Sequence, residues 1–144
     1  MSQKSSVLFV CIGNAIRSQM AEAFARHYGA DVLIPASAGL APAVNIMPLT
    51  RKVMLDRNID LGDAIPKGLH DLPQIPYDIV VNISGYPIPP ELGRSHREWE
   101  IRDPMGGKEE KYQATASEIE RRVVELLIEV RESRKRKKAS GKLN

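Results

Sequence analysis

The sequence predicts an α/β protein with one domain, built on a four-stranded parallel sheet with helices on both faces. The chain has 144 residues, which is about the length of one domain. Short apolar runs typical of buried strands alternate with segments of helical periodicity, and this alternation is characteristic of parallel sheets covered by helices. With 42% hydrophobic and 27% charged residues, the composition is that of a globular protein.

The first half of the chain is expected to contain two strands and two helices. The apolar run Ser6–Val10 predicts a buried strand, and Arg17–Gly29 has apolar residues at helical spacing before a terminal glycine. Val32–Ala36 predicts a second strand. An apolar loop at Leu40–Met47 follows, and Pro48 is well placed to begin a helix. The loop could either cover a substrate or pack on the body of the protein.

The second half of the chain is expected to contain two more strands and one long helix. Tyr77–Ile83 predicts the third strand, and Arg97–Ile101 predicts a short fourth strand. Glu109–Arg136 has the apolar periodicity of a long helix with one buried face. We therefore assign the domain to residues 1–136 and expect residues 137–144 to form a basic, frayed tail.

Charge does not indicate a nucleic-acid-binding protein. The net charge is +3, but the residues from Arg131 onward carry +6, so the rest of the chain carries −3. Two Phe and one Trp offer few surfaces on which bases could stack. We interpret the basic segment as a solvated helix end, with a weak anion or nucleic-acid patch as the alternative. We expect a monomer.

The remaining composition excludes several classes of protein. No run of about 18 apolar residues is present, and the N-terminal apolar stretch is too short for a secretory signal, so we expect no membrane association. A single cysteine excludes an internal disulfide and a multi-cysteine zinc site. We expect a protein of the reducing cytoplasm that needs no metal or cofactor.

The segment between the first strand and the first helix carries the chemistry. It consists of Cys11, Ile12, Gly13, Asn14, Ala15, Ile16, Arg17 and Ser18. Backbone N–H groups at a helix N-terminus converge on one point, where the helix dipole favours an anion. Arg17 adds a planar group that can bind two oxyanion oxygens. The same field favours an ionised sulfur, so we predict that Cys11 is a nucleophile aimed at a tetrahedral oxyanion.

Other residues of this segment, and one beyond the fourth strand, are expected to support the nucleophile. Gly13 permits close backbone approach, Asn14 tolerates left-handed geometry and can brace the loop, and Ser18 can donate a hydrogen bond to the sulfur. A leaving oxygen needs a proton. Asp103 follows the fourth strand, so it is expected at the same sheet edge as Cys11 and is the candidate general acid.

The segment VLFVCIGNAIRSQMAEA, the SAG at Ser37–Gly39 and the Asp103-Pro104 pair resemble the low-molecular-weight protein tyrosine phosphatases and the related thioredoxin-coupled arsenate reductases. The resemblance implies a flavodoxin-like three-layer fold and a phosphocysteine intermediate. It implies that Asn14, Ser18 and Ser37 hold the loop. Glu22 matches an acidic position that helps to bind potassium in some of the reductases.

The sequence also departs from both branches of this family. Met105-Gly106 stands where the phosphatases carry a tyrosine pair, so one aromatic wall is missing. The reductases carry two further cysteines near the third strand, and this chain has none there. Ile16 replaces a second cysteine of the loop. Lys67 aligns with an acid of the potassium-binding branch, and we hypothesise that its ammonium group replaces the ion beside Glu22.

Three functions fit these residues. The first is a cysteine-dependent phosphatase that hydrolyses aryl or tyrosine phosphate monoesters, with inorganic phosphate or arsenate as further ligands. The second is an arsenate reductase that uses an external thiol, such as glutathione or mycothiol. The third is a module that binds oxyanions without catalysis, or a phosphocysteine carrier. A carrier needs no acid for a leaving group, so Asp103 favours the enzymes.

Overall fold

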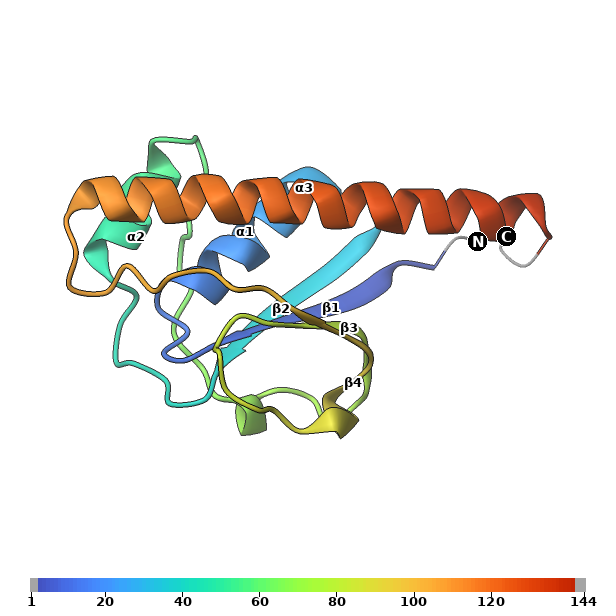
Figure 1. Cartoon of the computed structure of the whole chain (residues 1–144), viewed down its shortest axis with the longest axis horizontal. Coiled ribbons are helices and arrows are strands. Elements are labelled where there is room, and N and C mark those ends of the chain that lie inside the picture. Colours follow the sequence, from blue (N-terminus) through green and yellow to red (C-terminus); the bar gives the residue numbers. More distant parts are fainter. Residues whose placement is uncertain (1–2, 142–144) are drawn as a thin grey trace.

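A computed structural model describes residues 3–141 and contains one parallel sheet of four strands (Figure 1). The strands are β1 (Ser5–Cys11), β2 (Leu33–Gly39), β3 (Tyr77–Asn82) and β4 (Gly93–Glu98). Their order is β2-β1-β3-β4, and every neighbouring pair is parallel. The predicted fold class is confirmed. Because β1 is central, the segment that follows it leaves the middle of the sheet edge.

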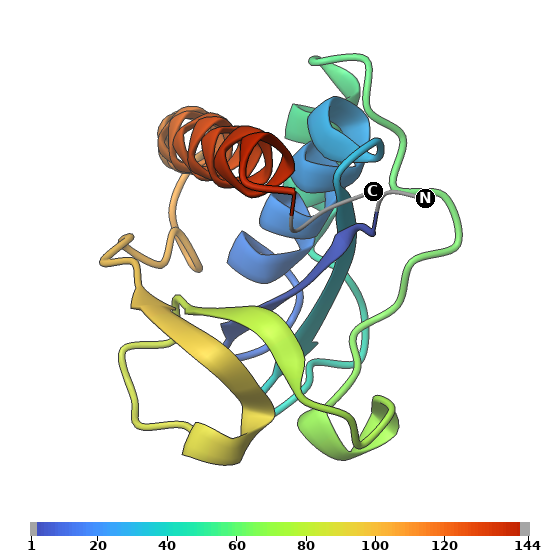
Figure 2. The same cartoon turned by 90° about the vertical axis from the view of Figure 1, so that its right-hand side faces the viewer.

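The two faces of the sheet are covered unequally (Figure 2). The three α-helices, α1 (Arg17–Gly29), α2 (Pro48–Leu55) and α3 (Glu109–Ala139), pack on one face. The other face is covered by loops and by two single turns of 3₁₀ helix, η1 (Leu69–Asp71) and η2 (Pro90–Leu92). The α-helices therefore cover one face only, and the prediction of helices on both faces is met on the other face by nothing longer than two single turns of 3₁₀ helix.

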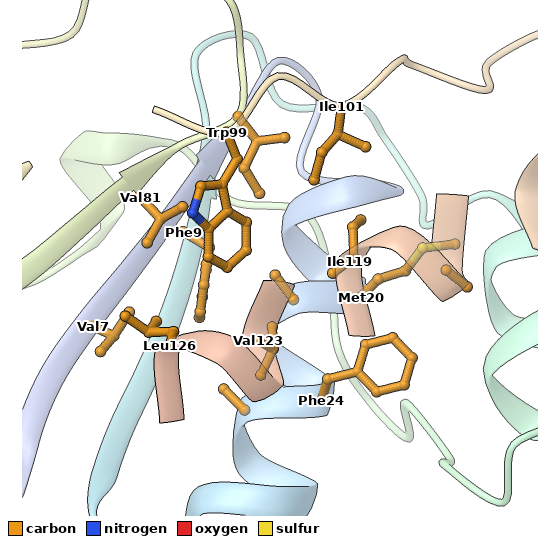
Figure 3. Close-up of a cluster of buried hydrophobic side chains, with 14 of the residues drawn as sticks. Val7, Phe9, Met20, Phe24, Val81, Trp99, Ile101, Ile119, Val123 and Leu126 are labelled. Carbon is orange, nitrogen blue, oxygen red and sulfur yellow. The ribbon is translucent and has the colours of Figure 1, made fainter. Parts of the chain in front are cut away.

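The main core lies between the sheet and the α-helices (Figure 3). Alternate residues of β1 point to opposite faces, so Phe9 faces the helices while Leu8 faces the 3₁₀ turns. The rings of Phe9 and Trp99 pack with centroids 5.8 Å apart. Phe24 of α1 and Val123 of α3 complete this contact region, and both are fully buried. This layer anchors α1, whose first residue belongs to the candidate site.

The fourth strand is not where the sequence predicts it. It covers Gly93–Glu98 rather than Arg97–Ile101. The true strand, GRSHRE, contains no apolar residue, and hydrophobic periodicity therefore cannot identify it. It forms at the sheet edge through backbone pairing, and Gly93 lets it lie against Val80, whose Cγ2 would be only 2.4 Å from an added Cβ. Trp99 follows the strand and is buried.

Other boundaries shift by a few residues. β2 runs to Gly39 rather than ending at Ala36, and this extension brings the SAG segment beside the end of β1. α3 continues to Ala139, so residues 137–139 of the predicted tail are helical, while residues 142–144 lie outside the described chain. None of the helices within residues 3–141 combines the length and the apolar character needed to cross a membrane.

Candidate active site

The candidate site is a backbone loop between β1 and α1, held from outside by the segment that follows β2. Four carbonyl groups of the loop accept hydrogen bonds of 2.8–3.3 Å from this segment. The acceptors are Cys11, Ile12, Gly13 and Ala15; the donors are the amides of Leu40, Ala41, Ala43 and Met47 and the hydroxyl of Thr50. The apolar segment at residues 40–47 is therefore packed against the loop, which decides between the two interpretations of it.

These carbonyl groups accept hydrogen bonds from outside the loop, and the backbone N–H groups of the loop therefore face its interior. Within residues 3–141, the backbone N–H groups of residues 12–18 have no protein acceptor. Asn14 adopts a left-handed conformation with φ of 52°, which lets the loop curl. Arg17 begins α1, and the dipole of this helix adds partial positive charge beside these amide groups. The loop therefore has the construction of an anion-binding nest.

The loop also requires a glycine on the neighbouring strand. Gly39 pairs with Cys11 at the end of β2. A Cβ at Gly39 would lie 2.6 Å from the Ile12 carbonyl oxygen and 2.8 Å from the Asn14 nitrogen. No side chain can occupy this space without displacing the loop.

We expect Gly39→Ala to lower the free energy of unfolding by about 1–3 kcal/mol, because the backbone cannot yield to the added carbon. Chemical denaturation measures this loss. Gly13→Ala is the control, since its Cβ would only reach ordinary contact distance from Ala43, 3.7 Å. Equal stability of the two variants would show that the loop tolerates displacement at Gly39.

The hydrogen bonds around Cys11 orient the hydroxyl proton of Ser18 toward the sulfur atom. The Sγ atom of Cys11 lies 2.8 Å from the hydroxyl of Ser18. The side-chain amide of Asn14 donates to the same hydroxyl at 2.7 Å, so the oxygen of Ser18 already accepts a hydrogen bond. Its own hydrogen is then free to point at Cys11. The Ser18 hydroxyl therefore holds the sulfur atom of Cys11 in position.

Asn14 is the centre of the network that holds the loop. Its Nδ2 atom donates to Ser18 and also to the Ser37 hydroxyl at 3.0 Å. Its Oδ1 atom accepts from Gln19 Nε2 and from the backbone amide of Lys67, both at 3.0 Å. All four hydrogen-bonding positions of this fully buried amide are occupied, which fixes its orientation. Sequence reasoning identified Asn14, Ser18 and Ser37 as a network but missed Gln19, whose signal is a polar side chain on the buried side of α1.

An acidic group ends the network at the surface. Ser37 donates to Glu22 Oε1 at 2.5 Å. Arg26 forms an ion pair with Glu22 at 2.9 Å, and the Lys67 ammonium lies 3.9 Å from Glu22 Oε1. The structure thus brings Lys67 beside Glu22. The replacement of an ion by this ammonium group remains a prediction.

Arg17 links the loop to the ends of the third and fourth strands. Its guanidinium donates to the carbonyl oxygens of Ile83 at 2.9 Å and Ile101 at 3.0 Å. These contacts compensate the burial of the charge and fix the plane of the group. The remaining nitrogen, Nη2, lies 3.4 Å from a carboxylate oxygen of Asp103.

Asp103 faces the loop from beyond the fourth strand. Its Oδ1 atom accepts a hydrogen bond from the Met105 amide at 3.0 Å, which orients the carboxyl group. The side chain is 37% exposed, so it can exchange a proton with solvent. Burial, with a smaller effect from the charge of Asp103, raises the pKa of Tyr112, which places the acid near the first turns of α3.

The candidate reactive groups converge on one small cavity of about 20 Å³. It is lined by Cys11, Gly13, Ala15, Ile16, Arg17, Asp103 and Met105. A volume of this size holds about one water-sized group. Cys11 is only 2% exposed, so a reactant must reach its sulfur through this opening. The three residues that sequence analysis assigned to the chemistry thus lie together, although they come from distant parts of the chain.

A cysteine at the end of a central parallel strand, an amide nest and a buried arginine define the class of cysteine-dependent oxyanion enzymes. The family model for low molecular weight phosphotyrosine protein phosphatases matches residues 6–88. The chain belongs to this family.

Several of the proteins to which the chain is similar are named arsenate reductases. Arsenate reductase 1 of Bacillus cereus is 32% identical over 133 residues, which are 85% of this chain and 94% of that protein. Glutaredoxin arsenate reductase of Synechocystis is 29% identical, covering 86% and 97% of the two chains. A solved structure described as an arsenate reductase in the phosphate binding state has a TM-score of 0.81 at 28% identity and covers 88% of this chain and 98% of its own.

Proposed function

We propose that this protein is an arsenate reductase that uses an external thiol as its reductant. The observation that carries the proposal is the single cysteine of the chain, placed in an amide nest opposite Arg17 and Asp103. Arsenate is a tetrahedral oxyanion of the kind that such a nest binds. The names of the similar proteins support arsenate as substrate. An internal relay of electrons needs a second sulfur, so the reducing thiol comes from another molecule.

The reaction begins with attack of the Cys11 sulfur on arsenic. An As–O bond breaks, and the leaving oxygen departs as water with a proton from Asp103. Arg17 and the loop amides stabilise the remaining oxygens as charge develops on them. A covalent Cys11–arsenate adduct results, with arsenic still in the +5 state.

Reduction then takes place at sulfur. An external thiolate attacks the Cys11 sulfur, and the S–As bond breaks with its electron pair passing to arsenic, which leaves as arsenite in the +3 state. Cys11 is left in a mixed disulfide with the external thiol. A second thiol attacks the outer sulfur and regenerates Cys11. For each turn, two thiols become one disulfide and one arsenate becomes one arsenite.

Phosphate-monoester hydrolysis is the second candidate, because Asp103 faces the same cavity from which an alcohol would leave. One feature weighs against an aromatic substrate. Met105, which is half exposed, lines the cavity, and within residues 3–141 none of the lining residues is aromatic, so an aryl group finds no ring to pack against there.

An assay of reductants separates the two candidates. The purified protein is given arsenate with glutathione, mycothiol or thioredoxin plus its reductase, and arsenite is quantified by chromatography. Hydrolysis of p-nitrophenyl phosphate is followed in parallel. We expect at least one low-molecular-weight thiol to support arsenite formation faster than the ester is hydrolysed. Hydrolysis without arsenite formation from any of the three reductants would overturn the proposal in favour of a phosphatase.

A further inference from the structure

A second polar groove lies at the end of the sheet opposite Cys11. It has a volume of about 480 Å³ and is bordered by the first residues of β1, β3 and β4 and by the last third of α3. Figure 1 shows the C-terminal end of α3 beside the start of β1, at the far end of the molecule from the loop that precedes α1. The groove therefore shares no residue with the candidate active site.

The carboxylates that line this groove are already engaged by the protein. Glu129 of α3 forms two short contacts with the guanidinium of Arg97, at 2.6 and 2.7 Å. Asp78 accepts hydrogen bonds from the backbone amide and the hydroxyl of Ser6. Arg134 is also engaged, since it donates to the backbone carbonyl of Gln3.

Three cations of the groove have no such partner. Lys4 precedes β1, Arg94 lies in β4 and Lys137 lies in α3, and all three are exposed. In the described part of the chain, none of them forms an ion pair. Three like charges around one groove repel one another, and an anion bound between them would relieve that repulsion.

The other residues that line the groove indicate which class of anion it would bind. Ser5, Ser95 and Ser133 are half buried between the cations, and their hydroxyl groups can donate to phosphate oxygens. Among residues 3–141, no aromatic side chain lines the groove, so this part of the chain offers no surface there on which a base could stack. Its volume is that of a small-molecule site rather than of a nucleic-acid duplex.

We propose that this groove binds a small oligophosphate, a molecule with two or more phosphate groups and no aromatic ring. Lys4, Arg94 and Lys137 come from three separate parts of the chain around a groove of about 480 Å³, and a chain of phosphates can offer each of them its own anionic group. The site is independent of the reaction at Cys11, and the inference does not rest on the proposed function.

Inorganic tripolyphosphate is the probe that tests the site. The ¹⁵N-labelled protein is titrated with tripolyphosphate at constant ionic strength, and the amide signals of residues 12–18 are followed separately from those of the groove. We expect saturable shifts of the amide signals of Ser5, Arg94, Ser95 and Lys137. The variant Arg94→Gln/Lys137→Gln should bind about tenfold more weakly, because it loses two partly solvated charge contacts.

The control variant is Arg136→Gln/Lys138→Gln, which removes the same amount of charge, on either side of Lys137 in α3, from residues that do not line the groove. It should bind with less than about twofold loss, since bulk charge at this distance is screened by salt. Equal weakening of both variants, or no saturable binding, would overturn the proposal. An oligonucleotide that shifts signals along the outer face of α3, and competes with tripolyphosphate, would assign the surface to nucleic acid instead. Both variants should keep the turnover at Cys11, which shows that they are folded.

Discussion

Replacing Cys11 with serine is expected to abolish turnover while leaving oxyanion binding intact. A hydroxyl in the same position is far less ionised than a thiol and cannot form the mixed disulfide from which Cys11 is regenerated. The loop amides and Arg17, the groups proposed to bind the oxyanion, are unchanged by the substitution. Arsenite formation should fall below detection with every thiol, and calorimetric titration with phosphate should still show one bound ion at the loop.

The binding measurement makes this prediction specific. Loss of both turnover and phosphate binding in Cys11→Ser would indicate that the loop has collapsed rather than that the nucleophile is missing. The variant Cys11→Ala, which also lacks the contact between the sulfur and Ser18, then tests the fold through its thermal unfolding. Arsenite formation by Cys11→Ser at a rate near that of the unmodified protein would contradict the assignment of the nucleophile.

Asp103→Asn is expected to lower kcat by about 10²- to 10⁴-fold, the usual contribution of a general acid. Asparagine keeps an oxygen that can accept the Met105 amide, so the loop around it should hold its shape. The loss should depend on the leaving group. With a series of aryl phosphates, the variant should lose least where the leaving phenolate is most stable, because such a group needs no proton.

Glu100→Gln is a matched control for this variant. It removes one negative charge only three residues away, but Glu100 does not line the cavity that contains Cys11. Its kcat should stay within about threefold of the unmodified protein, since a surface charge is screened. Equal losses in the two variants would indicate a general electrostatic effect, and an unchanged rate for Asp103→Asn with a poor leaving group would remove Asp103 from the mechanism.

The fold could be predicted where hydrophobic pattern and structure coincide. The central strands β1 and β3 are buried on both faces, and continuous apolar runs therefore mark them. The edge strand β4 has no such pattern, because its residues pair through the backbone and leave alternate side chains exposed. Gly29 was predicted as a helix end for its backbone freedom. In the structure it ends α1, but an added Cβ would lie 2.3 Å from Leu127, so its role is close packing of α1 on α3.

Part of the candidate site could likewise be predicted from the sequence, and part could not. Cys11, Arg17 and Ser18 belong to one short segment, so their proximity follows from local sequence, and the position of Asp103 follows from the rule that parallel strands end at one edge. The contacts that hold the loop come from Gln19, Thr50 and the backbone of residues 40–47 and 67. These are long-range or backbone hydrogen bonds, and no residue type or spacing in the sequence indicates them.

The mass of the protein after one turnover tests most directly whether Cys11 forms a mixed disulfide with the external thiol. The reduced protein is mixed with arsenate and one equivalent of the thiol that supports turnover, quenched in acid, and measured intact. We expect an added mass of one thiol, disulfide-linked to Cys11, the single cysteine of the chain, and formed only when arsenate is present. An adduct that forms equally without arsenate, or arsenite released with Cys11 never modified, would contradict it.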